Sequence, residues 1–216
     1  MNNSYIFIFN VGRGFSSLIY LPNGTAILYD IGATNNGFSP LDFIKENITQ
    51  YIKEYKGKNI AQLLISHPHG DHIREISKIK DDDYGLRPYY LTCPNHLCEG
   101  EEFNYERVNN KPDQDYLLDD YKEILEGREP PLRTISAEDA GEMPHIEYGI
   151  YYMRPPVVDR IHNKENQDYT NGCSIVTYYK HGKNSILFTG DITPRVFERL
   201  IDEKHGSEKR YTKFEN

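Results

Sequence analysis

The sequence predicts an α/β fold in which two β-sheets are flanked by helices. Three observations support this prediction: runs of β-branched and aromatic residues occur toward both ends of the chain, amphipathic helical patterns separate them, and polar clusters directly follow two of the expected strands. The 216 residues suffice for one full hydrophobic core, and composition marks no internal boundary. We therefore expect a single domain over residues 1–216, with an insertion at about 81–165.

The N-terminal part begins with three predicted strands. Residues 5–9 and 17–21 are rich in β-branched and aromatic side chains, with a glycine-containing turn between them. A Pro-Asn-Gly turn then leads into a third strand at 26–30. These segments predict an opening β-meander.

A helix is predicted after the meander, and a strand and a second helix follow it. Ser39 and Pro40 supply an N-cap and a first-turn proline. Five apolar residues then recur at helical spacing before Gly57: Leu41, Ile44, Ile48, Ile52 and Tyr55. A short apolar strand is expected at 61–65, and beyond a histidine-rich loop a helix presents Ile73, Ile76 and Ile79 on one face.

The later part of the chain is less regular. A strand is expected at 89–92 and a helix at 114–125. Residues 174–179 and 185–189 then predict a β-hairpin. After Thr193 and Pro194 a last helix carries four apolar residues: Val196, Phe197, Leu200 and Ile201.

Composition restricts the setting in which the chain works. Its net charge of -8 offers no broad basic surface for coating nucleic acid, although it does not exclude hydrolysis of a phosphodiester. The apolar run at residues 5–9 is too short for a signal peptide or a membrane span, so we expect no membrane insertion. Three cysteines fit a reducing compartment, and we expect a cytoplasmic location.

The most informative motif is the histidine loop, residues 66–72, which follows the predicted strand at 61–65. It holds His67, His69, Asp71 and His72. Imidazole nitrogens together with a carboxylate oxygen suit zinc, and also manganese or iron(II). The loop therefore predicts a metal site at the end of a strand.

The histidine motif and a later Phe-Thr-Gly-Asp-Ile segment at 188–192 together resemble the metallo-β-lactamase superfamily. The segments at 11–14, 30–32 and 171–174 are similar to the branch that contains the hydrolase domain of ComEC-type DNA-uptake proteins. The resemblance implies an αββα sandwich of two mixed sheets with helices outside. It also implies a metallohydrolase, with a metal-bound hydroxide attacking a phosphodiester of nucleic acid or a nucleotide.

The same resemblance implies the site residues and the cofactors. His67 and His69 would bind a first metal, Asp71 and His72 a second, and Asp191 would bridge the two. Zinc is the favoured ion and manganese the alternative. Asp71 would also orient the hydroxide as a catalytic residue.

This chain departs from the family pattern where many relatives have a third histidine on the first metal. Residues 168–173 contain none, as is common in the ComEC-like branch. Cys173 and Asp168 are chemically competent substitutes, although a cysteine at the start of a strand is more often a small buried hydrophobe. His162 is a weaker candidate and is expected at the surface.

A second possible metal site, formed by Cys93, His96 and Cys98, lacks a second pair of ligands. Buried thiols are therefore the favoured interpretation of the two cysteines.

Two further departures concern the ends of the chain. His205-Gly206-Ser207 follows the last helix without the strand that relatives place there, which favours a helix C-cap and suggests a truncated C-terminus with a weaker second metal. Arg13 lies near the expected metal edge and could meet a substrate phosphate.

Two alternative functions stay open: hydrolysis of other esters or lactones, and an interaction module that is inactive until a protein partner or a missing segment completes it.

Overall fold

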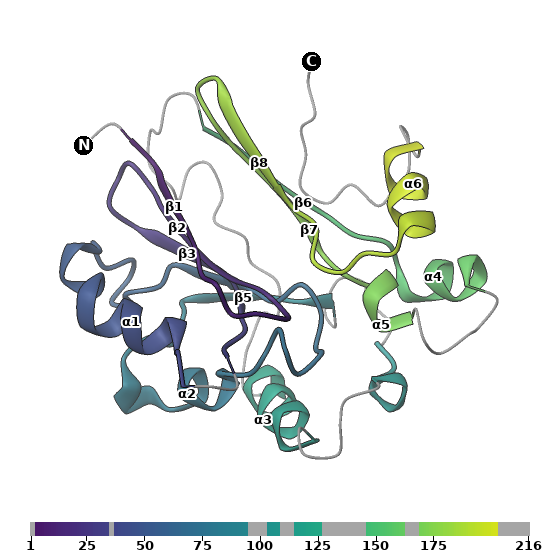
Figure 1. Ribbon diagram of the computed structural model, residues 1–216, viewed down its shortest axis with the longest axis horizontal. Helices are drawn as coiled ribbons and strands as arrows, with labels where there is room; N and C mark the ends of the chain where they lie inside the picture. Colours follow the sequence, from purple (N-terminus) through teal and green to yellow (C-terminus); the bar gives the residue numbers. More distant parts are fainter. Residues whose placement is uncertain are drawn as a thin grey trace. The chain divides into compact units, whose positions relative to one another are not determined.

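The computed structural model describes residues 3–34, 37–94, 103–108, 115–126, 146–162 and 169–202. It confirms a mixed α/β fold (Figure 1). The chain forms two compact units, the first from Met1–Thr92 with Asn110–Met143 and the second from Cys93–Asn109 with Pro144–Asn216. Among the described residues, each unit contains one β-sheet.

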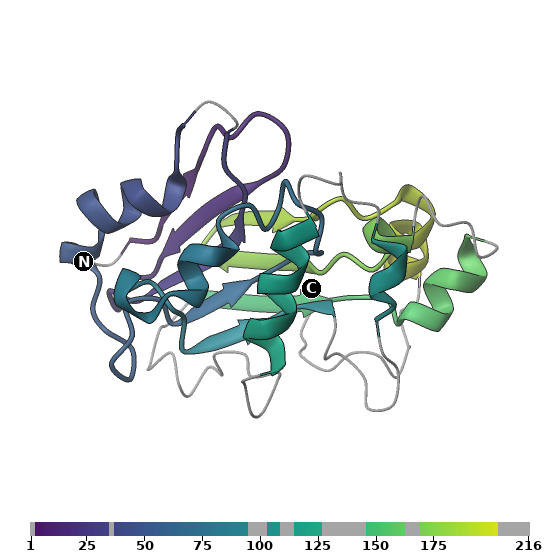
Figure 2. The same cartoon turned by 90° about the horizontal axis from the view of Figure 1, so that it is seen from below.

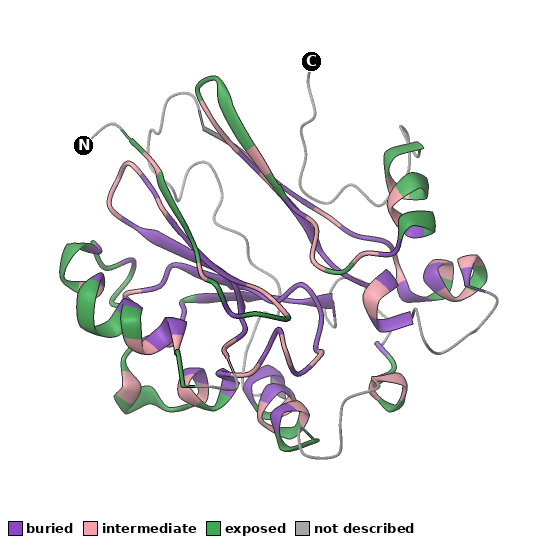
Figure 3. Ribbon diagram, in the orientation of Figure 1, coloured by how far each residue is buried: buried purple, intermediate pink, exposed green. Residues whose placement is uncertain are grey.

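The sheet of the first unit has five strands in the order of the sequence and is mixed. Its strands are β1 (Tyr5–Ile8), β2 (Ser16–Tyr20), β3 (Ala26–Ile31), β4 (Gln62–Leu64) and β5 (Tyr90–Thr92). The first three form the predicted antiparallel meander, and β3, β4 and β5 run parallel. Strand β3 is buried along its whole length and β2 almost so, which places the core of this unit at the middle of the sheet (Figure 3).

Three α-helices and two 3₁₀ turns accompany this sheet in the described residues. They are α1 (Pro40–Asn47), η1 (Thr49–Tyr51), α2 (Ile76–Lys80), η2 (Asp82–Tyr84) and α3 (Asp115–Glu126). Helix α3 lies beside α2 (Figures 1 and 2). Polar contacts join the two helices, because Asp120 accepts hydrogen bonds from Ser77 and from Lys80, the latter at 2.8 Å.

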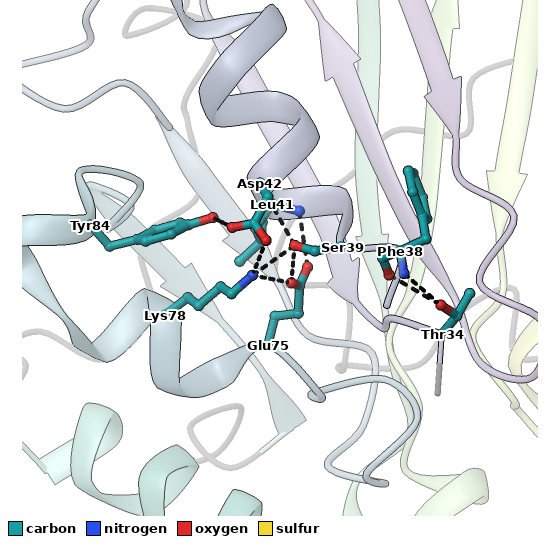
Figure 4. A network of polar contacts seen from close by, with 8 residues as sticks. All are labelled: Thr34, Phe38, Ser39, Leu41, Asp42, Glu75, Lys78 and Tyr84. Atoms are coloured by element: carbon teal, nitrogen blue, oxygen red, sulfur yellow. Dashed lines mark hydrogen bonds and ion pairs between the residues drawn. The ribbon is translucent and has the colours of Figure 1, made fainter. Parts of the chain in front are cut away.

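Helix α1 is fixed to α2 through a buried carboxylate (Figure 4). The Glu75 side chain accepts a hydrogen bond from the Leu41 backbone N–H at 2.9 Å and another from the Ser39 hydroxyl. Ser39 in turn caps α1 by accepting from the Asp42 N–H, and Lys78 pairs with both Asp42 and Glu75. The predicted N-cap of α1 is therefore confirmed, and it is also an anchor between two elements.

Helix α1 is shorter than its apolar spacing predicts. The prediction continued the helix to Gly57, whereas the α-helix ends at Asn47 and a 3₁₀ turn follows. Ile52 takes an extended conformation, and the next backbone N–H, of Lys53, donates to the Gly24 carbonyl at 2.8 Å. Ile52 and Tyr55 are buried all the same. The regular spacing of Ile52 and Tyr55 therefore reflects the burial of their side chains and not a helical backbone.

The second unit has an antiparallel sheet of β6 (Ile146–Tyr151), β7 (Val176–His181) and β8 (Asn184–Phe188). The predicted hairpin of β7 and β8 is confirmed, whereas β6 had no sequence prediction. We expected a mixed sheet, but the strands described here are antiparallel throughout. The other elements described in this unit are η4 (Tyr105–Arg107), α4 (Pro155–Ile161), α5 (Tyr169–Gly172) and α6 (Pro194–Asp202). Among the described helices of both units, none has the length and apolarity needed to cross a membrane.

Candidate metal centre

The histidine loop connects β4 to α2 and is held from two sides. The backbone of Ile65 continues the parallel pairing, donating to the Thr92 carbonyl at 2.9 Å. At the other end of the loop, the Ile31 N–H donates to the His72 carbonyl at 2.9 Å, and the Glu75 N–H donates to the Ile31 carbonyl. The loop is thus fixed between the ends of β3 and β5, where rigid strands position its side chains.

Three imidazoles of this loop come together. His67 Nε2 and His69 Nδ1 are 3.0 Å apart, and the ring centroids of His67 and His72 are 4.2 Å apart. Two nitrogen ligands on one tetrahedral zinc, with bonds of 2.0–2.1 Å, would be about 3.3 Å apart. The spacing of His67 and His69 therefore fits two ligands of a single ion.

Burial keeps His67 in the form that binds metals. The side chain is fully buried, which lowers its pKa well below the ordinary value, and the neighbouring imidazoles of His72 and His69 lower the pKa further. A neutral imidazole can coordinate a metal, whereas an imidazolium cannot. The residues of this loop thus fit a divalent ion in both geometry and protonation.

Asp30 is a site residue that the sequence analysis left without a role. It is the next-to-last residue of β3, which is buried throughout, and its Oδ2 lies 2.8 Å from His72 Nδ1. The backbone N–H and the hydroxyl of Ser66 donate to the same carboxylate at 2.6 and 2.7 Å. Burial raises the pKa of Asp30, while its contacts with His72 and Ser66 lower it. Because the carboxylate engages Nδ1, coordination by His72 would use Nε2, as in carboxylate–histidine–zinc arrangements.

The signal for Asp30 was present in the sequence. A carboxylate directly after four buried apolar residues, Ala26 to Tyr29, has no reason to lie there unless a partner compensates its burial. The structure adds a second sign: the backbone φ of Asp30 is 54°, which is unusual for a residue other than glycine.

Asp71 is half-buried, and its backbone is enclosed by two glycines of the same unit. A Cβ atom at Gly14 would lie 2.1 Å from the Asp71 carbonyl oxygen, and one at Gly32 would lie 2.3 Å from it. Only glycine permits these approaches. The loop between β1 and β2 therefore lies directly against the histidine loop.

The two remaining predicted ligands, Asp191 and Cys173, belong to the second unit. Asp191 is exposed in the turn between β8 and α6. Two residues later, Thr193 Oγ1 lies 2.8 Å from His162 Nε2. His162 is buried, so the expectation of a surface residue was wrong. Its contact with Thr193 joins α4 to the start of α6.

Cys173 lies in an apolar cluster of the second unit. Its neighbours there are Phe103, Met153, Val158, Tyr169 and Val196. Burial raises the pKa of the thiol, which disfavours the thiolate needed for metal binding. This environment favours the buried-hydrophobe alternative for Cys173. Cys93 is buried too, as expected, while Asp168, His96, Cys98 and the segment 205–207 lie outside the described residues.

Comparison with known families gives one match. The family model described as the metallo-beta-lactamase superfamily matches residues 10–83, a stretch that contains Asp30 and the whole histidine loop. No curated protein matches the chain. Members of this superfamily are generally hydrolytic metalloenzymes, so the match supports metal-dependent hydrolysis. Over residues 10–83 the chain is therefore similar to the metallo-β-lactamase superfamily.

Proposed function

We propose that the chain is a metal-dependent hydrolase that cleaves phosphodiesters of nucleic acid or nucleotides. The observation that carries the proposal is the histidine loop: two ring nitrogens 3.0 Å apart beside a third imidazole whose orientation is fixed by a buried carboxylate. The phosphodiester preference is supported by the resemblance of several segments to the ComEC-like branch.

We propose His67 and His69 as ligands of a first divalent ion, Asp71 and His72 as ligands of a second, and Asp191 as the bridging carboxylate. Two such ions, when bound, lower the pKa of water and stabilise negative charge on the attacked and leaving oxygens. Nitrogen and oxygen donors suit zinc, and manganese is the alternative. Cys173 is the weakest of the proposed ligands because its thiol is surrounded by apolar side chains.

The protein side chains would divide the remaining tasks. Asp30 holds the His72 ring by its Nδ1 edge, so that the opposite nitrogen keeps one direction. Ser66 holds Asp30 through two hydrogen bonds. The half-exposed Asp71 carboxylate would accept a hydrogen bond from the attacking water and orient it.

The proposal is tested by metal analysis of the purified chain together with hydrolysis of bis(4-nitrophenyl) phosphate in zinc or manganese. We expect two ions per chain, and a loss of turnover of at least about a hundredfold in His69→Ala. The control His181→Ala changes an imidazole at the end of β7 and should keep wild-type turnover.

Two results would contradict the proposal. A chain that binds no divalent ion would remove the metal site. Two bound ions without turnover of any phosphodiester, carboxylic ester or lactone would favour the interaction module instead.

A further inference from the structure

We infer that Arg13 binds the negatively charged phosphoryl group of the substrate and so makes the site selective for anionic esters. This inference rests on the proposed function, because it assigns a substrate contact beside the metal-binding loop. Its basis is the position of the loop between β1 and β2.

That loop is held rigidly at both ends. The Val11 N–H donates to the Phe9 carbonyl at 3.1 Å, and the Gly32 N–H donates to the Phe15 carbonyl at 2.8 Å. The Phe15 ring also packs edge-on against the buried ring of Tyr29, with centroids 5.8 Å apart. The backbone that carries Arg13 is therefore fixed to the core of the first unit.

The same loop touches the histidine loop next to Arg13. Gly14 approaches Asp71 so closely that a Cβ atom would lie 2.1 Å from the Asp71 carbonyl oxygen. The α-carbon of Arg13 is one residue away, about 3.8 Å from that of Gly14. Gly12 and Gly14 both have positive φ angles, 78° and 84°, so the chain turns sharply on either side of Arg13. Arg13 thus projects from a turn that abuts a proposed metal ligand.

The charge of Arg13 is available to a ligand. Its side chain is exposed, and within the described part of the chain it forms no ion pair. The chain carries a net charge of -8, so an anionic substrate needs a local cation to offset the repulsion. A guanidinium matches two phosphoryl oxygens with parallel N–H groups, which a lysine ammonium cannot do.

The test compares an anionic with a neutral ester in the metal-loaded chain. In Arg13→Gln we expect KM for bis(4-nitrophenyl) phosphate to rise about tenfold to a hundredfold, the usual effect of losing a charged hydrogen bond. We expect kcat for that substrate, and both constants for 4-nitrophenyl acetate, to stay within about threefold. Arg13→Lys should recover part of the loss, since it keeps the charge but not the fork.

The control Arg160→Gln removes the same charge from an exposed position on α4 and should match the wild type for both substrates. An unchanged KM for the phosphodiester in Arg13→Gln would overturn the inference. Equal losses on the phosphodiester and the neutral ester would overturn it too, because they indicate damage to the metal site.

A second measurement separates this inference from the proposed function. Binding of inorganic phosphate to the metal-loaded chain, followed by calorimetry, requires no turnover. We expect Arg13→Gln to weaken it about tenfold or more without changing the metal content. An inactive wild type would refute the proposed hydrolase while phosphate binding still tests Arg13, and equal phosphate binding by wild type and Arg13→Gln would refute the role of Arg13.

Discussion

Asp30 is held in a conformation that opposes stability. Its side chain is fully buried, and burial raises its pKa. Its φ of 54° lies in the left-handed region that disfavours most L-residues. Ser66 and His72 satisfy the carboxylate by hydrogen bonding, but an apolar side chain would need no such compensation. The orientation of His72 therefore explains the presence of Asp30 better than stability does.

This interpretation predicts that Asp30→Asn separates metal binding from folding. Asparagine tolerates the left-handed backbone and nearly preserves the shape, so the melting temperature of the metal-free chain should change by only a few degrees, about the effect of 1 kcal/mol. Zinc affinity should fall about tenfold to a hundredfold, because the amide no longer holds His72 as a carboxylate does. Competition with a chelator measures the affinity.

The exposed Asp83→Asn is the matched control and should bind zinc as the wild type does. If Asp30→Asn kept wild-type zinc affinity, Asp30 would have no role in positioning His72.

At the scale of elements, Glu75 is a buried polar link between α1 and α2. It lies at the N-terminal end of α2, yet it accepts hydrogen bonds from Leu41 and Ser39 at the start of α1 (Figure 4). Its own backbone N–H donates to the carbonyl of Ile31, the last residue of β3. One residue thus fixes two helices to the strand that carries Asp30.

Glu75→Ala should therefore destabilise the fold by about 2 kcal/mol, because the buried Leu41 N–H loses its acceptor and Lys78 loses a partner. For a chain of this size the melting temperature should fall by roughly 4–8 °C. Glu75→Gln keeps an acceptor oxygen for Leu41 and should lose less. Thermal unfolding measures both variants, with the exposed Glu54→Ala as a control of near-wild-type stability. Equal melting temperatures for Glu75→Ala and Glu54→Ala would show that α1 does not depend on this anchor.

Over the whole molecule, patterns with a short period predicted structure well. Strands β1, β2 and β3 and the β7–β8 hairpin follow the sequence prediction within about two residues, because alternation and turn residues are local signals. The prediction made helix α1 too long. The spacing of Ile52 and Tyr55 reflects the burial of their side chains, and an extended segment can bury the same side chains.

The site was predictable only where its residues are close in sequence. His67, His69 and His72 lie within one loop, so their clustering follows from spacing alone. The partner of His72 is Asp30, 42 positions earlier, and only the pairing of β3 with β4 brings them together. His162 had no sequence signal for burial, because its contact with Thr193 depends on how α4 packs near α6.

The stability of the whole chain depends on pH, and His67 lowers it under acidic conditions. Burial holds its folded-state pKa well below the ordinary value of about 6.5. At pH values between these two pKa values, the unfolded chain binds a proton that the folded chain does not. The contribution of His67 to the free energy of unfolding therefore falls as the pH drops below about 6.5, by at most about 1.4 kcal/mol per pH unit.

Replacing His67 by Asn removes the group that binds this proton in the unfolded chain. The metal-free variant should therefore lose less stability than the wild type between about pH 6.5 and 5.5. Urea denaturation at several pH values measures the two slopes. Equal slopes for the wild type and His67→Asn would mean that His67 binds as many protons in the folded chain as in the unfolded chain, and therefore that burial does not lower its pKa.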